Sequence, residues 1–152
     1  MIKVLFVCHG NICRSPMAEF IFKKLVRDNK LDSRIEAASA ATSAEEIGNP
    51  VYPPAKAYLR RRGIDASGKR ARQLRREDFD EYDLIIAMER YNIANMRKLE
   101  PFAKEGQVRL LMDFTDEPGD IGDPWYSGDF EGVGAQIEKG CAGLLNELRE
   151  TL

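Results

Sequence analysis

The sequence predicts an α/β protein, a three-layer sandwich in which a four-stranded parallel sheet has helices on both faces. Short apolar segments alternate along the chain with longer segments whose apolar residues recur every three or four positions. Strands that alternate with helices pair in parallel through right-handed crossovers, which bring helices to both faces of the sheet. Because 152 residues is a usual length for one domain, we expect residues 1–152 to form a single domain.

Four apolar segments account for the predicted strands. Residues 2–7 form a short, continuous apolar run, and residues 82–88 give the clearest pattern of a buried strand. Residues 107–112 supply another strand, and residues 34–39 supply one with a weaker pattern. A helical segment follows each of these strands, as parallel pairing requires.

Capping residues and apolar spacing mark the predicted helices. Ser15 is expected to cap the first helix, with Pro16 at its first position. Residues 54–62 form a second helix, which ends at a glycine, and residues 91–99 form a third. The last helix has one apolar face, made by Ile137, Cys141, Leu144, Leu145 and Leu148.

Two segments show no clear periodicity, residues 40–53 and residues 113–128. They follow the second and fourth predicted strands. Ligands of parallel α/β sheets bind beyond the carboxyl ends of the strands. We therefore expect both segments to lie beside a binding site, together with the loop after the first strand.

The composition excludes several classes of function. Lys and Arg number 23 and Asp and Glu number 25, so the net charge is −2. A chain this close to neutral is a poor general binder of nucleic acid or anionic membranes, and we expect it to bind neither. The only histidine is His9. Any mechanism that needs a histidine elsewhere is thereby excluded.

Cysteine usage predicts the compartment. The chain has three cysteines, an odd number that argues against a disulfide framework and for a reducing, cytoplasmic environment. The apolar start at residues 2–7 has no small-residue cleavage site after it, so we interpret it as a buried strand and not as a signal peptide. No apolar run approaches the roughly 20 residues that span a bilayer.

The densest chemical signal joins the first strand to the first helix. It reads Cys-His-Gly-Asn-Ile-Cys-Arg-Ser-Pro over residues 8–16. A helix N-terminus and a tight loop turn N–H groups inward and form a cup for an anion. Gly10 and Asn11 are residue types that tolerate left-handed backbone, and Arg14 offers a planar fork for two phosphate oxygens. The segment therefore predicts a phosphate site.

The same cup favours a reactive sulfur. Cys8 lies at its base, and a helix N-terminus beside an arginine stabilises a thiolate, which is a strong nucleophile. The Ser15 hydroxyl is placed to hydrogen-bond this sulfur and to stabilise it when it leaves phosphorus again. A Cys-x5-Arg spacing alone is weak, but the combination with a strand before it and Arg-Ser-Pro at the helix start is specific.

Residues 8–16 closely resemble the signature of the low-molecular-weight protein tyrosine phosphatases. Further segments resemble this family in the same order, namely residues 39–43, 47–50, 71–73 and 123–124. The resemblance implies a flavodoxin-like fold of the phosphotyrosine phosphatase I type. It implies hydrolysis of phosphotyrosine through a cysteinyl phosphate, with Cys8 as nucleophile, Arg14 as phosphate clamp and Asp123 as general acid and base. It also implies phosphotyrosine proteins as partners, no cofactor and no metal.

Other site residues fall into two groups. Substrate and phosphate are expected to contact His9, Gly10, Asn11, Ile12, Cys13, Ser15, Glu45, Trp125 and Tyr126. Loop support is expected from Asn11, Ser15 and Ser39. The aromatic pair after Asp-Pro should wall a pocket deep enough for a phenyl phosphate, from whose rim phosphoserine would not reach the sulfur. Plain burial in the core is the alternative for these aromatics.

Two residues depart from the family pattern. Glu45 stands where an aromatic is usual, and it would favour basic residues beside the phosphotyrosine. Lys69 stands near the usual position of a histidine that supports a Ser39–Asn11 network, so this network is expected to be altered. The resemblance also implies a reversible Cys8–Cys13 disulfide that protects the nucleophile, for which a simple loop-filling role of Cys13 is the alternative.

Three rival functions have related sequence features. Arsenate reductase uses a similar loop but needs further cysteines, and only Cys141 remains, on a helix face. A phosphoarginine phosphatase of this family carries a threonine where this chain has Ile12. A catalytically dead binding module would lack Cys8 or Asp123, and both are present. We expect an active monomer, with weak self-association as the alternative.

Overall fold

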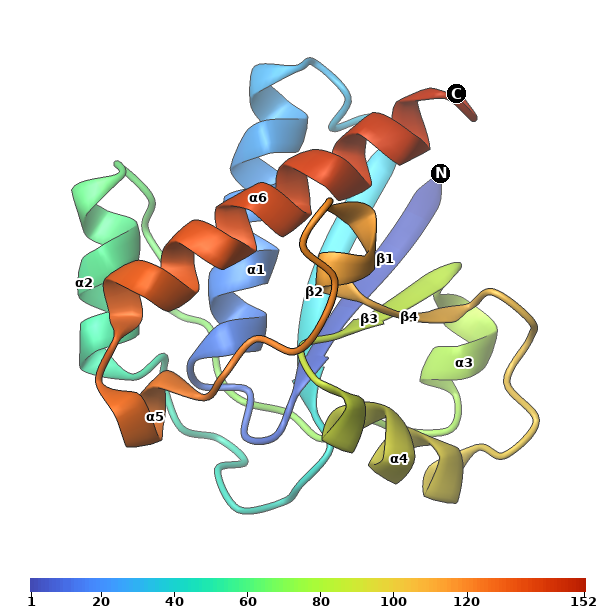
Figure 1. Ribbon diagram of the computed structural model, residues 1–152, viewed down its shortest axis with the longest axis horizontal. Helices are drawn as coiled ribbons and strands as arrows, with labels where there is room; N and C mark the ends of the chain where they lie inside the picture. Colours follow the sequence, from blue (N-terminus) through green and yellow to red (C-terminus); the bar gives the residue numbers. More distant parts are fainter.

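A computed structural model, which describes residues 1–152, contains one four-stranded parallel sheet with helices on both faces (Figure 1). The strands are β1 (Ile2–Cys8), β2 (Ile35–Ala41), β3 (Leu84–Ala87) and β4 (Val108–Leu110), in the order β2-β1-β3-β4. The predicted fold class is confirmed.

Strand β1 lies in the middle of the sheet, which determines where the first loop emerges. Phe6 pairs with Ser39 of β2 and with Ile86 of β3, and Cys8 pairs with Ala41. Side chains of β1 are buried on both faces, as the continuous apolar run requires. The loop after Cys8 therefore leaves the sheet edge with a strand on either side of it.

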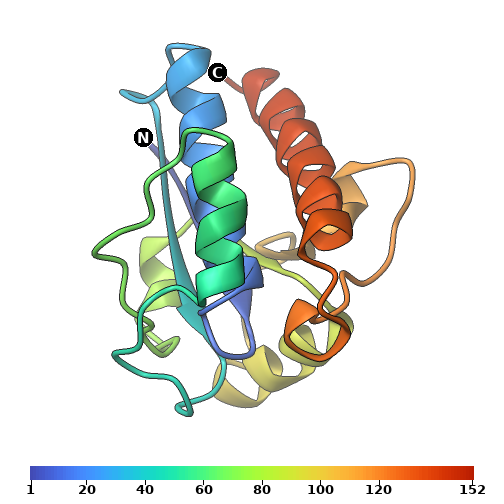
Figure 2. The same cartoon turned by 90° about the vertical axis from the view of Figure 1, so that its left-hand side faces the viewer.

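Two helical layers cover the sheet. One face carries α1 (Arg14–Asp28), α2 (Pro53–Arg61) and α6 (Phe130–Arg149), which lie side by side in Figure 2. Val4 and Phe6 point into this layer, where Phe6 meets Phe22 of α1 edge to face at 5.5 Å between ring centroids. The other face carries α3 (Asp78–Glu81) and α4 (Arg90–Leu99) and receives the remaining side chains of β1.

Close contacts hold α6 against its neighbours. A Cβ at Gly134 would lie 2.1 Å from the ring of Tyr58 in α2, so only glycine allows this approach. The Tyr58 hydroxyl donates a hydrogen bond to Glu138 of α6, and the Arg62 guanidinium lies 3.7 Å from the Tyr58 ring centroid. The α2–α6 contact fixes the helix layer beside the loop that follows β1.

The element boundaries mostly agree with the sequence prediction. The second and third predicted helices are confirmed to within one residue, while β2 continues to Ala41 and β3 is shorter than residues 82–88. The fourth predicted strand becomes a 3₁₀ helix, η1 (Leu111–Phe114), after three residues. The short helices α3 and α5 (Pro124–Ser127) were not predicted, since four residues are too few to show a helical period.

The predicted cap at Ser15 is wrong. Helix α1 begins at Arg14, and Cys13 in the capping position makes no side-chain hydrogen bond. The Ser15 hydroxyl is engaged elsewhere, because it contacts the Cys8 sulfur and Asn11. The amino end of α1 is thus left with backbone N–H groups facing the loop. None of the helices is both long and apolar enough to cross a membrane.

Candidate active site

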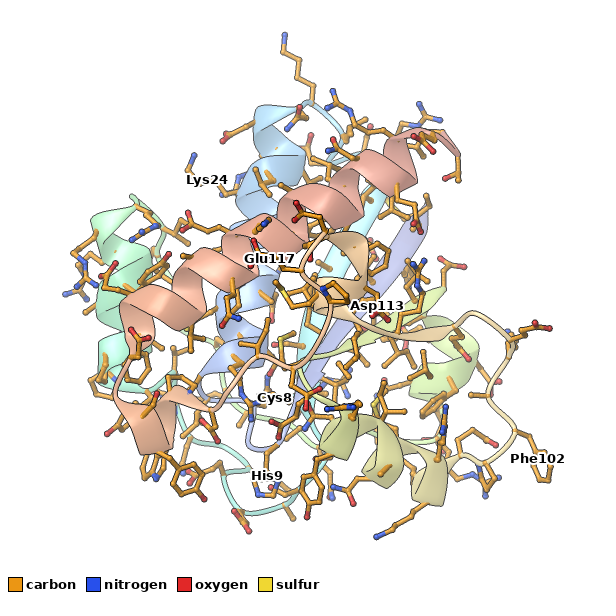
Figure 3. The ribbon with its side chains drawn as sticks, viewed as in Figure 1. Cys8, His9, Lys24, Phe102, Asp113 and Glu117 are labelled. Atoms are coloured by element: carbon orange, nitrogen blue, oxygen red, sulfur yellow. The ribbon has the colours of Figure 1, made fainter.

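The Cys8 sulfur lies at the centre of the loop between β1 and α1, where β1 ends (Figure 3). Its Sγ is 3.0 Å from the Ser15 hydroxyl oxygen and accepts hydrogen bonds from the backbone N–H groups of Asn11, at 3.3 Å, and Ser15, at 3.4 Å. Three hydrogen-bond donors thus converge on the buried sulfur. The predicted contact between Ser15 and the sulfur is present.

Asn11 gives the loop its shape. It has a φ of 60°, in the left-handed region that asparagine tolerates better than most residues. Its side-chain amide donates to Ser15 Oγ at 2.8 Å and to Ser39 Oγ at 2.9 Å, and its carbonyl oxygen accepts from the Arg72 N–H at 3.1 Å. Gly10 keeps a negative φ, contrary to the expectation for it; a Cβ there would approach Glu46 Cγ at 3.3 Å.

A buried carboxylate sets the direction of these hydrogen bonds. Ser39 donates its hydroxyl hydrogen to Glu19 at 2.5 Å, so the Ser39 oxygen is left to accept from Asn11. Asn11 then uses both of its amide hydrogens as donors, and the Ser15 oxygen accepts one of them. The Ser15 hydrogen remains available for the Cys8 sulfur.

Lys69, which stands near the usual position of a histidine in the family, lies beneath the loop. Its ammonium donates to the Ser39 carbonyl oxygen at 3.0 Å and lies 3.4 Å from the Glu19 carboxylate. Burial lowers the pKa of Lys69, while the neighbouring Glu19 acts in the opposite direction. Lys23 also pairs with Glu19, at 2.5 Å. Lysine ammonium groups are therefore the cations beneath the loop, and the Asn11–Ser39 hydrogen bond is present.

Arg14 connects the loop to two other segments. Its side chain is 1% exposed, and its Nη1 donates to the Ile121 carbonyl oxygen at 2.9 Å and lies 3.1 Å from Glu89. Its Nη2 is 3.4 Å from Asp123 Oδ2. The Nε atom is buried and has no acceptor in the protein. A guanidinium has five N–H donors, so Arg14 keeps donor capacity for an anion in the loop.

Asp123 is held on the opposite side by its own short helix. It caps α5, where Oδ1 accepts the N–H of Trp125 at 3.0 Å, and Pro124 occupies the first helical position. Its other carboxylate oxygen faces Arg14. The carboxyl group is partly exposed, with 24% of its side chain accessible. The carboxyl group therefore lines the cavity and is open to a bound molecule.

A cavity of about 200 Å³ opens over the sulfur. Its walls are made by Cys8, His9, Gly10, Ile12, Cys13, Arg14, Glu45, Glu46, Asp123, Trp125 and Tyr126. The predicted aromatic pair is not core, since Trp125 is 49% exposed and Tyr126 is 85% exposed. Asn11, Ser15 and Ser39 are buried and absent from the cavity wall. Their side chains hold the loop from below.

Sequence reasoning missed three residues at this site. Glu46 lines the cavity next to Glu45, and Glu89 pairs with Arg14 from the segment just after β3. Tyr52 packs under Trp125 at 4.5 Å between ring centroids. Only its position just after the carboxyl end of a strand could have marked Glu89 as a site residue from the sequence. The predicted site residue Glu45 contacts His9, at 3.1 Å between Oε2 and Nε2.

The remaining cysteines differ in their surroundings. Cys13 lines the cavity yet is buried, and burial raises the pKa of its thiol well above the usual range, with the nearby Cys8 acting in the same direction. Cys141 is fully buried in α6, where its thiol contacts the Ala18 carbonyl oxygen. All three cysteines are unpaired. The structure has no group of three or more side chains arranged to hold a metal ion.

Comparison with known proteins agrees with this geometry. The family described as low molecular weight phosphotyrosine protein phosphatase matches residues 3–152. The chain is 42% identical to the low molecular weight protein-tyrosine-phosphatase YfkJ of Bacillus subtilis, over 99% of this chain and 97% of that one. It is 38% identical to the human low molecular weight phosphotyrosine protein phosphatase, over 95% and 94% of the two chains.

Solved structures lead to the same conclusion. The crystal structure of YfkJ superposes with a TM-score of 0.96, covering 99% of this chain and 96% of that one. The structure of Vibrio vulnificus Wzb in complex with benzylphosphonate has a TM-score of 0.85 at 28% identity, with 96% and 98% coverage. The sequence resemblance is thus confirmed, and the chain belongs to the low molecular weight phosphotyrosine protein phosphatase family.

Proposed function

We propose that this protein is a protein-tyrosine phosphatase that hydrolyses phosphotyrosine through a phosphocysteine at Cys8. One observation carries the proposal. The buried sulfur faces a cup of donors in the same cavity that holds Arg14 and Asp123. A nucleophile, an anion clamp and an acid therefore meet at one place, as phosphate-ester cleavage by covalent catalysis requires.

In the first step the Cys8 thiolate attacks phosphorus, and the bond between phosphorus and the tyrosine oxygen breaks. Asp123 gives its proton to the departing phenolate oxygen, so the product leaves as neutral tyrosine. Arg14 and the inward N–H groups of the loop hold the equatorial phosphate oxygens, whose charge they stabilise in the transition state. The unpartnered Nε of Arg14 supports this role.

In the second step a water molecule attacks the phosphocysteine. Asp123, now a carboxylate, takes a proton from this water, and the bond between sulfur and phosphorus breaks. Inorganic phosphate and the thiolate are released. The Ser15 hydroxyl, 3.0 Å from the sulfur, stabilises the leaving thiolate by donating a hydrogen bond. Each charge is met by groups of the chain itself, so EDTA should leave the rate unchanged.

The cavity walls support an aryl phosphate as substrate. Trp125 and Ile12 give the phenyl ring apolar contacts, and a serine phosphate lacks a ring to fill this space. Ile12 likewise offers no hydroxyl for the guanidinium of phosphoarginine. Arsenate reduction is not favoured, because Cys141 is fully buried and has no path for a disulfide relay to the surface. Glu45 on the rim favours a basic residue next to the phosphotyrosine.

The decisive test compares peptides that carry phosphotyrosine, phosphoserine or phosphoarginine in the same sequence, with arsenate reduction assayed alongside. We expect turnover of the phosphotyrosine peptide at a kcat/KM at least about 100 times that of the other two, since an unfilled aryl pocket costs a few kcal/mol. Equal turnover of phosphoserine would remove the pocket argument. Arsenate-dependent thiol oxidation at a comparable rate would favour the rival function.

Cys13 supplies a second proposal at the same site, a reversible disulfide with Cys8. Hydrogen peroxide would oxidise the Cys8 thiolate to a sulfenic acid, and the Cys13 thiol would then displace water from it to form the disulfide. Dithiothreitol should restore activity after a brief peroxide exposure. In Cys13→Ala the recovery should be lost on longer exposure, because the sulfenic acid oxidises further. Equal recovery in both proteins would leave Cys13 as a filler of space.

The cytoplasm is the proposed location, and the protein is proposed to act as a monomer. Three unpaired cysteines, one of them at the catalytic position, support a reducing compartment. Light scattering across a range of protein concentrations tests the monomer, and a constant mass near 17.2 kDa is expected.

A further inference from the structure

A second groove adjoins the catalytic cavity. It has a volume of about 500 Å³ and lies between the loop at residues 46–53 and the first two turns of α2. Ile12, Glu46 and Trp125 line both hollows. Trp125 therefore forms a partition, with the sulfur on one side and the groove on the other. The catalytic cavity and the groove are thus neighbours that share these side chains in their walls.

The groove carries two free cations. Lys56 and Arg60 line it from positions one helical turn apart on α2, and neither has a carboxylate within 4 Å. The following residues of α2 differ, because Arg61 pairs with Glu131 and Arg62 pairs with Glu138. The paired arginines face α6, whereas the unpaired cations face the groove.

The rest of the groove surface is largely apolar. Val51, Pro53 and Ala57 contribute apolar lining, and the Tyr52 ring packs at a tilt against Trp125. Glu46 is the single acidic residue in the lining, and its carboxylate is engaged by the side-chain amide of Asn49 at 2.5 Å. The groove therefore combines an apolar floor with two cations and one carboxylate, so that positive charge is in excess in its lining. A peptide backbone with an acidic side chain fits this chemistry.

We infer that this groove binds the peptide segment on one flank of the phosphotyrosine and selects substrates with an acidic residue there. The inference rests on the proposed function, since it needs phosphotyrosine in the adjoining cavity. Glu45 and His9 lie on the wall of the catalytic cavity away from α2, outside this groove. The charge around the rim is therefore asymmetric. Glu45 makes one part acidic, and Lys56 and Arg60 make another part basic. It fits a substrate whose two flanks differ in charge.

The test measures an acidic preference ratio. It is the kcat/KM of a phosphotyrosine peptide with glutamate at one flanking position, divided by that of the same peptide with serine there, scanned over four positions on each side. We expect a ratio of about two to ten at one or two positions on a single flank, the effect of one or two partly exposed ion pairs. The ratio should fall towards one in high salt.

Charge reversal assigns the preference to its residues. In K56E/R60E the ratio should drop to one or below at the same positions. Arg34→Glu is the matched control, because Arg34 is exposed and unpaired. It lies next to the amino end of β2, whereas the catalytic loop follows the carboxyl end of β1. The control should keep the wild-type ratio. A wild-type ratio of one at every position, or an unchanged ratio in K56E/R60E, would overturn the inference.

Phenyl phosphate separates this inference from the proposed function. It fills the catalytic cavity and has no flanking peptide. If the wild-type protein hydrolyses phenyl phosphate but shows no acidic preference, the groove assignment fails and the phosphatase stands. If phenyl phosphate and all phosphotyrosine peptides are left intact, the proposed function itself fails. Inorganic phosphate bound by Lys56 and Arg60 would compete with the acidic residue of the peptide and lower the acidic preference ratio. If micromolar phosphate abolished this ratio, a peptide-specific groove would be excluded.

Discussion

The two loops that meet over the cavity differ in how they are held. The loop from Cys8 to Ser15 is mostly buried, and Asn11 ties it to Ser39 of β2, which in turn donates to Glu19 of α1. The loop that carries Asp123 is exposed, and its aromatic residues reach the surface. A nucleophile and its anion cup have to be preorganised, because reorganisation in the transition state would cost rate. The acid loop has to admit the substrate and release the product.

Substitutions in the buried loop and in the exposed loop should also have different effects on stability and rate. A change in the buried loop removes hydrogen bonds that have no replacement, so stability and rate fall together. A change in the exposed loop removes contacts to the substrate and leaves the core intact. The following predictions test this difference, from the largest expected effect to the smallest.

Cys8→Ser should abolish turnover, with a loss of at least about 10⁴-fold, while the loop still binds the anion. The serine hydroxyl is a far weaker nucleophile, and the N–H groups around it are unchanged. Steady-state assays with phenyl phosphate measure the loss, and calorimetric titration with inorganic phosphate measures the binding. Substantial residual turnover would rule out a covalent intermediate at this residue.

Asp123→Ala should lower kcat by about 10²- to 10⁴-fold for substrates with poor leaving groups, because the phenolate then departs without a proton. The loss should be much smaller for phenols activated by electron-withdrawing groups. Asp116→Ala, an exposed change in the preceding part of the same segment, serves as control and should be silent. An equal loss for good and poor leaving groups would remove the acid role from Asp123.

Asn11→Ala should lower both kcat and the free energy of unfolding, the latter by about 2–4 kcal/mol. Two side-chain amide donors and one acceptor are lost, and alanine is strained at a φ of 60°. Asn11→Gly relieves the strain but not the lost hydrogen bonds, so it should recover part of the stability and little of kcat. Urea unfolding and kcat measured on the same preparations test this; full recovery of kcat by glycine would mean that only the backbone shape matters.

Trp125→Ala should raise KM by about threefold to tenfold and change the free energy of unfolding by about 1 kcal/mol or less. Half of the indole is exposed, and its main contact inside the protein is the ring of Tyr52. Trp125→Phe should retain most of the affinity. A loss of stability as large as that of Asn11→Ala would show that the acid loop is as firmly built as the nucleophile loop.

The sequence predicts the local parts of this site better than the distant ones. Cys8, Arg14 and Ser15 could be found because their spacing within one strand–loop–helix segment follows from backbone geometry. Glu89 could not, because its meeting with Arg14 depends on how β3 ends beside β1. The same holds for the groove, which arises from the approach of α2 to Trp125.

The fold shows the same limit. The apolar periods predicted the sheet and the long helices, whereas the end of β4 and the cap of α1 were decided by tertiary contacts. Ser15 has the residue type of a helix cap, yet the sulfur and Asn11 compete successfully for its hydroxyl. The capping propensity of a residue type is thus only a preference, and hydrogen-bond partners nearby in the folded structure can override it.

The guanidinium of Arg14 touches two segments that are far apart in the chain, one through Glu89 and the other through Ile121 and Asp123. The Arg14 side chain therefore connects separate segments of the chain in addition to supplying a positive charge. If an anion in the cup draws the Arg14 guanidinium towards itself, the Asp123 carboxylate that contacts this guanidinium should move with it. On the proposed mechanism, ligand binding would then also align Asp123. A lysine at position 14, with one ammonium on a flexible stem, would keep the positive charge but lose the simultaneous contacts with both segments.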